Sequence, residues 1–186
     1  MDNDIISQIN HAYANWTESL DSHRLSYLLS VQHFEERWVQ VEFAYHLSLV
    51  IENKDVWMEA YKKKYDIAIY PKATASTPVT LIELKTVKNY DLPFWTSRLQ
   101  TDIDKLRAAK RDSGEIRCFF MILSAFGQPS SQVVWAKKAL SKEIYHDRLN
   151  KKLEEIGFKQ PGVEKSFTDS SGMFNKMGIT MHLLEV

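Results

Sequence analysis

The segment Thr80–Val87 constrains the fold most, because both faces of the strand it predicts are apolar, yet it carries two charges. Alternate side chains of an extended strand share a face, so Glu83 and Lys85 point the same way, together with Leu81 and Val87. A strand that is apolar on both sides usually lies in the centre of a covered sheet. Charges at such a position need a partner, a metal or a catalytic role. An internal ion pair and an edge-strand decoration remain alternatives to a functional site.

Length and composition predict one domain spanning residues 1–186, since 44% hydrophobic and 26% charged residues suit a globular chain with an ample core. No run of about 18 apolar residues occurs, and the start, Met1–Asp4, is acidic where a signal peptide is basic. We therefore expect a cytoplasmic chain without membrane contact. Cys118 is the only cysteine. It lies in an apolar run and is predicted to be a buried core residue rather than a ligand or disulfide partner.

Charge is distributed unevenly although the formal net charge is zero. Residues 1–60 hold ten acids and three Lys or Arg, whereas residues 61–186 hold fourteen acids and twenty-one Lys or Arg. This asymmetry favours a basic contact surface on the later part of the chain and an acidic surface elsewhere, suited to a partner subunit. Solvated helix faces produce the same counts, so both interpretations stay open.

Hydrophobic periodicity and turn residues predict the order helix, three strands, helix, strand, helix, strand after a first helix. The predicted helices cover about 3–20, 24–51 with a break near Gln32–His33, 91–111 and 137–156, and the predicted strands cover 56–61, 65–70, 79–87, 116–125 and 179–186. Residues 162–178 are predicted to be an irregular loop. Four apolar residues at helical spacing should pack one helix on the sheet: Trp95, Leu99, Ile103 and Leu106.

Four charged residues, placed in this order of elements, resemble those of the PD-(D/E)xK nuclease superfamily. Glu83-Leu84-Lys85 on the third strand resembles the (D/E)xK element, Asp66 resembles the aspartate of the second strand, and Glu42 resembles the glutamate of the preceding helix. The resemblance covers about residues 24–125, with the last helix and strand compatible. It implies an α/β, restriction-endonuclease-like αβββαβ core, with a central mixed sheet flanked by helices and an N-terminal helical extension. The usual proline is replaced by Tyr65.

The neighbours of the candidate residues allow two interpretations of each. Asp66 is predicted to share a strand face with Ala68, whose small side chain leaves room for an ion, and to point away from Tyr65, Ile67 and Ile69. The alternative is an aspartate that caps a turn.

Glu42 has apolar neighbours, which favour a functional position, whereas Glu35, Glu36 and Arg37 occupy ordinary positions of the helix surface. The alternative is that Glu42 is simply exposed at the boundary of a helix face. Asp102 is predicted to lie on the flank of the apolar stripe, where it could assist the site or pair locally with Arg98 or Lys105, and the local pair is favoured.

The resemblance implies a Mg²⁺-dependent deoxyribonuclease, with Mn²⁺ as a substitute and endonuclease action favoured. Asp66, Glu83, the carbonyl of Leu84 and Glu42 would supply the hard oxygen ligands that Mg²⁺ prefers. Lys85 would orient the attacking water and stabilise the transition state. The helix at 91–111 lacks the Gln-x-x-x-Tyr pattern of the RecB-like branch, so exonuclease behaviour is not implied. DNA is the predicted partner, and cutting both strands favours a homodimer.

Two other functions stay open. A catalytically inactive member of the same fold would serve as a nucleic-acid-binding or protein-interaction module in a defence or repair complex. Retention of all four charged positions favours the enzyme over that module. In an unrelated α/β domain with an accidental motif, Glu42, Asp66 and Glu83 would lie far apart. The sequence contains neither a Gly-rich phosphate loop nor a Gly-x-Ser-x-Gly elbow.

Overall fold

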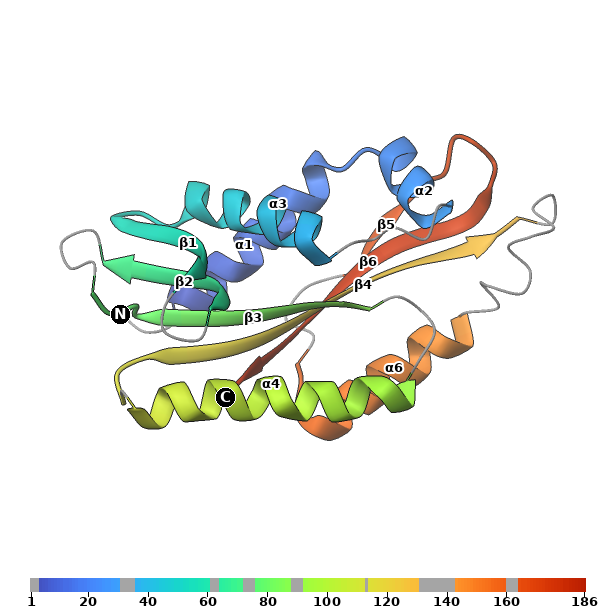
Figure 1. Ribbon diagram of the computed structural model, residues 1–186. Helices are drawn as coiled ribbons and strands as arrows, with labels where there is room; N and C mark the ends of the chain where they lie inside the picture. The colour runs from blue at the N-terminus through green and yellow to red at the C-terminus, as the bar shows by residue number, and fades with distance from the viewer. Residues whose placement is uncertain are drawn as a thin grey trace.

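The computed structural model describes residues 4–30, 36–60, 64–71, 76–87, 92–112, 114–130, 143–159 and 164–186. They form an α/β architecture in which helices flank a six-stranded mixed sheet (Figure 1). The elements are α1 (Asp4–Ser19), α2 (Ser22–Ser30), α3 (Glu36–Val50), β1 (Lys54–Ala60), β2 (Tyr65–Pro71), β3 (Thr80–Val87), α4 (Leu92–Asp112), β4 (Arg117–Pro129), α6 (Glu143–Ile156), β5 (Lys165–Phe167) and β6 (Phe174–Glu185). Within these ranges, no helix combines the length and apolar character needed to cross a membrane.

The sheet has the strand order β1-β2-β3-β4-β6-β5. Strands β1, β2 and β3 form an antiparallel meander. Strand β4 then pairs in parallel with β3, which requires a crossover connection, here α4. Strands β6 and β5 complete the sheet in antiparallel pairing. From α3 to β4, the chain therefore follows the predicted order of helix, three strands, helix and strand.

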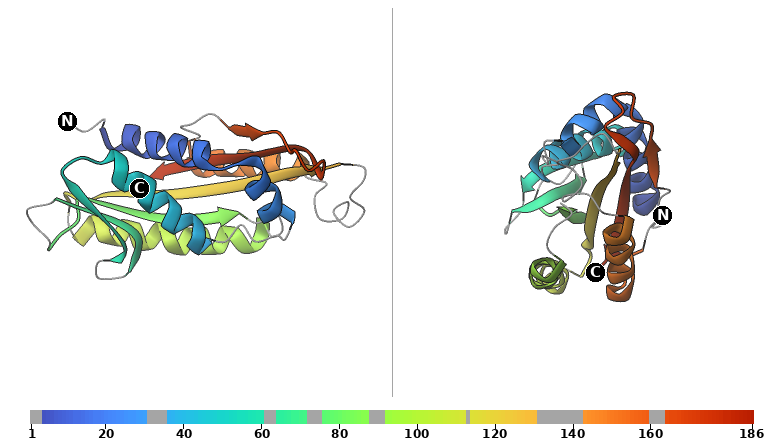
Figure 2. Two further views of the ribbon diagram at one scale, coloured as in Figure 1. Left: turned by 90° about the horizontal axis from the view of Figure 1, so that it is seen from above. Right: turned by 90° about the vertical axis from the view of Figure 1, so that its right-hand side faces the viewer.

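Strand β3 is central, as predicted for a segment that is apolar on both faces. Ile82 and Leu84 belong to the core formed with α1, α2 and α3, whereas Leu81 and Val87 belong to the core formed with α4 and α6. Figures 1 and 2 show these two groups of helices on opposite sides of the sheet. Every residue of β3 is buried except Lys85, which is partly exposed.

The predicted packing of α4 is confirmed for the side chains that are described. Leu99, Ile103 and Leu106 are buried in the core beneath α4, while the side chain of Trp95 lies outside the described residues. Cys118 is also buried, as predicted, and burial raises the pKa of its thiol to about 11. An inert core role follows for this cysteine.

The prediction of an irregular loop at 162–178 is wrong for much of that range. Strand β5 lies within it, and β6 begins at Phe174, five residues before the predicted strand start. Strand β4 likewise continues to Pro129, where it still pairs with β6. These extensions depend on pairing between distant parts of the chain, and β5 has three residues, too few for a periodic pattern.

Several predicted features lie outside the described residues. They are the helix break near Gln32–His33, the strand end at Tyr61, the residue Asp91 before α4, and the helix start at Lys137. Among the described residues, helix α6 begins at Glu143 and ends at Ile156, the predicted last residue.

Candidate active site

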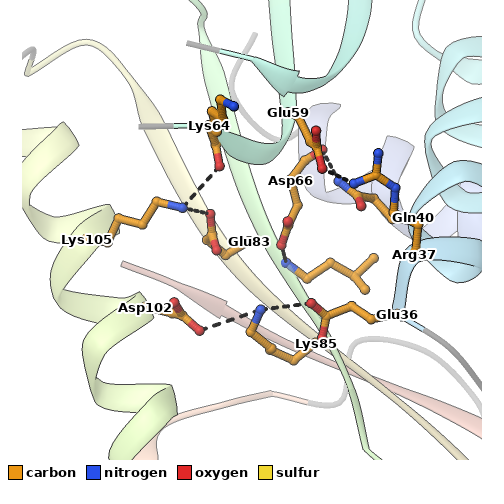
Figure 3. A network of polar contacts seen from close by, with 11 residues as sticks. Glu36, Arg37, Gln40, Glu59, Lys64, Asp66, Glu83, Lys85, Asp102 and Lys105 are labelled. Atoms are coloured by element: carbon orange, nitrogen blue, oxygen red, sulfur yellow. Dashed lines mark hydrogen bonds and ion pairs between the residues drawn. The ribbon is translucent and has the colours of Figure 1, made fainter. Parts of the chain in front are cut away.

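The two charged residues of β3 have partners on neighbouring helices (Figure 3). The Glu83 side chain is 3% exposed and is hydrogen-bonded by Lys105 of α4. The Lys85 side chain is 22% exposed and lies between two carboxylates, with its Nζ 3.0 Å from Glu36 Oε1 of α3 and 3.7 Å from Asp102 Oδ2 of α4. A network across three elements therefore contains the two charges that the sequence singled out.

Asp66 lies where β2 and β3 separate. The paired residues of these strands end at Ile67 and Ile82, and one step further the Asp66 carboxylate accepts a hydrogen bond from the backbone N–H of Leu84 (N···Oδ2 2.8 Å). The N–H and C=O of one strand residue point to the same edge, so the Leu84 carbonyl also faces β2. Gln40 of α3 donates to the backbone carbonyl of Asp66 at 2.7 Å. We call the place where Asp66 of β2 faces Glu83 and Leu84 of β3 the β2–β3 fork.

Asp66 and Glu83 influence each other across the fork. Continuing the register of β2 and β3 by one residue places them opposite one another. Burial raises the pKa of Glu83, the negative charge of Asp66 raises it further, and the hydrogen bond and charge of Lys105 lower it, which together give a pKa of about 7. Burial likewise raises the pKa of Asp66, against the hydrogen bond from Leu84 and the charge of Lys85. Both carboxyl groups therefore hold protons more tightly than exposed ones.

For Lys85, burial affects the pKa less than the neighbouring charged groups do together. Burial alone would lower its pKa, but the charges of Glu36, Asp66 and Asp102 and the hydrogen bond to Glu36 outweigh that effect. The pKa of Lys85 is therefore raised above its ordinary value, and the side chain remains an ammonium at neutral pH. Lys85 is suited to stabilise negative charge and not to accept a proton.

Negative charge exceeds positive charge at the fork. Among the described residues, the network brings four carboxylates and two ammonium groups together, while the adjacent Arg37–Glu59 pair of α3 and β1 is neutral. When these four carboxylates and two ammonium groups are all ionised, the excess of negative charge equals in magnitude the charge of one divalent cation. The contributing residues are Glu36, Asp66, Glu83 and Asp102 on the one hand and Lys85 and Lys105 on the other.

The donors at the fork are of the type that Mg²⁺ prefers. Carboxylates of Asp66 and Glu83 and the carbonyl of Leu84 are hard oxygen donors, and Mg²⁺ usually takes one or two protein carboxylates and keeps several waters. In the part of the chain that the structure describes, no set of three or more His, Cys, Asp or Glu side chains is arranged to hold a metal. A shell of two carboxylates and one carbonyl is compatible with that finding.

Glu42 is not part of this network, which corrects its predicted place at the site. Its Oε1 lies 3.7 Å from Arg24 of α2. Successive helix residues are rotated by about 100°, so Glu42 points about 200° away from Gln40, which contacts the fork. The carboxylate that α3 contributes to the site is that of Glu36, which the sequence had assigned to the surface.

Of the two local partners predicted for Asp102, Lys105 pairs elsewhere, and the side chain of Arg98 lies outside the described residues. Asp102 pairs with Lys85, and Lys105 pairs with Glu83, because α4 lies along the charged face of β3. Sequence reasoning missed Lys105 and Glu36 as site residues. The spacing of Glu36 and Gln40, four residues apart on one helix face, is a signal that could have found the correct side of α3.

Tyr65 lies on the other side of β2 from its predicted place. It packs in the core beneath α4 with Ala68, whereas Ile67 and Ile69 pack beneath α3. Tyr65 is the first residue of the strand and follows Lys64, which has a positive φ of 51°. The Tyr65 ring faces Lys105 of the network.

Comparisons of the chain with models of known protein families, with curated proteins and with solved structures give no match.

Proposed function

We propose that this chain is a Mg²⁺-dependent deoxyribonuclease, with Mn²⁺ as a substitute, acting as an endonuclease on a restriction-endonuclease-like fold. The observation that carries the proposal is the β2–β3 fork. There a buried Glu83 stands opposite Asp66, with the ammonium of Lys85 two residues further along the same strand. The αβββαβ order from α3 to β4 supports the finer fold assignment.

The residues of the fork would share the work of phosphodiester hydrolysis. Asp66, Glu83 and the carbonyl of Leu84 would hold a divalent ion, which when bound lowers the pKa of a water molecule and neutralises charge on the phosphate. Lys85 would orient the attacking water and stabilise the negative charge that develops on phosphate oxygens. Glu36 and Asp102 hold the Lys85 ammonium from two sides, so it is positioned before substrate binds.

The charge distribution supports DNA as the substrate. Residues 61–186 hold seven more Lys and Arg than acids, and phosphate contacts from such residues provide most non-specific DNA affinity. Exposed cations lie just before β2 and on α4, the elements that carry Asp66 and Lys105, and they are Lys64, Arg107, Lys110 and Arg111. A homodimer, in which each protomer cuts one strand, belongs to the same proposal.

One observation favours the alternative of a catalytically inactive nucleic-acid-binding or protein-interaction module. Lys105 already pairs with Glu83, and Lys85 already pairs with Glu36 and Asp102. Such pairs give both lysines a structural role without a metal. The two functions differ in whether DNA is cut, so a cleavage assay separates them.

The test is incubation of supercoiled plasmid, linear DNA and RNA with the purified chain in Mg²⁺ or Mn²⁺. We expect nicking or linearisation of the plasmid, and a loss of at least about 100-fold in Glu83→Ala and Lys85→Ala. Cleavage that requires free ends would indicate an exonuclease. Equal cleavage by wild type and both variants, or no cleavage under any condition, would contradict the proposed activity.

Two glutamates of α3 provide a matched pair for the same assay. Glu36→Ala removes a carboxylate that contacts Lys85, whereas Glu42→Ala removes one that contacts Arg24 of α2. We expect reduced cleavage in Glu36→Ala and wild-type cleavage in Glu42→Ala. The reverse result would restore the sequence-based assignment of Glu42.

A further inference from the structure

Lys105 is held at the fork by three contacts. Its ammonium hydrogen-bonds Glu83, donates to the backbone carbonyl of Lys64 at 3.3 Å, and lies 4.6 Å from the centroid of the Tyr65 ring. The Lys105 side chain is 23% exposed, whereas the Glu83 side chain is 3% exposed. The position of this ammonium is therefore set by several groups of the fold (Figure 3).

The contact between Lys105 and Glu83 conflicts with metal binding at the same carboxylate. The ammonium of Lys105 hydrogen-bonds Oε1 of Glu83 and so occupies one of the roughly four lone-pair positions of this carboxylate. Two cations at contact distance also repel one another strongly in a partly buried site. Lys85 creates no such conflict, because its partners are Glu36 and Asp102 and not Glu83.

We propose that Lys105 is the internal counter-ion of the site and that a divalent cation binds Glu83 only by displacing its ammonium. This inference rests on the proposed metal-dependent function. After displacement, the Lys64 carbonyl and the Tyr65 ring still offer the ammonium an acceptor and a π face. Lys105 thereby sets the concentration of metal at which the site fills, and it acts as a positioning residue for Glu83.

The test is isothermal titration of the full chain with Mn²⁺ in the absence of DNA. Lys105→Met should bind Mn²⁺ about tenfold more tightly than wild type, because displacement is no longer required. Lys105→Arg keeps the charge and should bind as wild type does. Lys85→Met removes a charge that does not contact Glu83 and should gain less. Lys110→Met, further along α4 with its Nζ on the Val186 carbonyl, should leave the affinity unchanged.

Several results would overturn the displacement. They are equal or weaker Mn²⁺ binding by Lys105→Met, a gain in Lys85→Met as large as that in Lys105→Met, and no Mn²⁺ binding by wild type or any variant. Circular dichroism identifies a variant that does not fold, and Lys105→Gln then replaces Lys105→Met. Tighter Mn²⁺ binding without DNA cleavage would contradict the nuclease alone. Metal-dependent cleavage with unchanged affinity in Lys105→Met would contradict the displacement alone.

Discussion

Asp66 at the β2–β3 fork and Asp169 in the turn between β5 and β6 both accept backbone hydrogen bonds, yet their pKa values shift in opposite directions. Asp66 accepts one bond, from Leu84, and burial raises its pKa. For Asp169, burial alone would raise the pKa, but bonds from Ser171, Phe174 and Ser26 together outweigh it. The pKa of Asp169 is therefore lowered.

The difference separates a structural carboxylate from a candidate functional one. Asp169 is stabilised as an anion by donors of its own turn, including the N–H of Phe174 at 2.8 Å, and needs no further cation. Asp66 and Glu83 hold negative charge that neighbouring donors and lysines compensate incompletely. Carboxylates in that state are the ones that gain most from a bound cation. Three predictions test this contrast.

The largest expected effect is on catalysis. Asp66→Asn keeps an oxygen that can accept the Leu84 hydrogen bond but loses the charge that would hold a metal, so plasmid nicking should fall at least about 100-fold. Asp169→Asn makes the same chemical change at the turn and should keep nicking within about twofold of wild type. Initial rates in Mg²⁺ measure both. Similar losses in the two variants would remove the functional distinction between the regions.

The next effect is on stability as a function of pH. The pKa of Glu83 in the folded chain, about 7, exceeds its ordinary value of 4.5, so the folded state binds a proton more tightly than the unfolded state. The stability due to this proton is fully present below about pH 4.5 and is lost as pH rises through about 7. Glu83→Gln stays neutral and should be more stable than wild type at pH 8 by about 1 to 3 kcal/mol.

Urea unfolding of wild type and Glu83→Gln at pH 8 and at pH 4 measures that difference. The gain at pH 8 should disappear at pH 4, where Glu83 itself is protonated. Ser48→Ala, which removes an exposed hydroxyl that donates to the Tyr45 carbonyl, changes no titrating group and is a control without pH dependence in this range. A Glu83→Gln variant that is less stable than wild type at pH 8 would show that Lys105 compensates the Glu83 charge completely.

The smallest effect concerns the turn. The pKa of Asp169 in the folded chain lies below its ordinary value of 3.8, so its contribution to stability is present above that pH and is lost as pH falls through the lowered pKa. Asp169→Ala should cost about 1 kcal/mol at pH 7. Thermal unfolding of wild type and Asp169→Ala at pH 7 and pH 3 measures this loss of stability, which should be smaller at pH 3. An equal cost at both values would mean that the charge of Asp169 contributes nothing.

Much of the fold follows from local patterns. The apolar run of β3 predicted a central strand, and the spacing of Leu99, Ile103 and Leu106 predicted the buried face of α4. Strand β5 and the first part of β6 did not follow, because their backbone bonds are made with each other and with β4. A local pattern does not contain the partner of a strand, so these extensions required the assembled sheet.

The site likewise contains residues that local patterns predicted and residues that they did not. Asp66, Glu83 and Lys85 were predicted from strand periodicity together with the resemblance to the nuclease superfamily, and the structure brings them to one fork. Glu42 was selected in place of Glu36 because its apolar neighbours suggested a buried position. Which side of α3 faces the sheet depends on packing against β1, β2 and β3, and this orientation places Gln40 at the fork and Glu42 near α2.

The sequence by itself determined that Glu83 and Lys85 share one face of a buried strand, because alternation of side chains is a property of the extended backbone. The tertiary structure alone decided the partners of each charge. Lys105 contacts Glu83, and Glu36 and Asp102 contact Lys85, because α3 and α4 pack at the fork from opposite sides of the sheet. Burial and the proximity of charged groups then shift the pKa values of Glu83 and Lys85, and neither burial nor proximity exists before the chain folds.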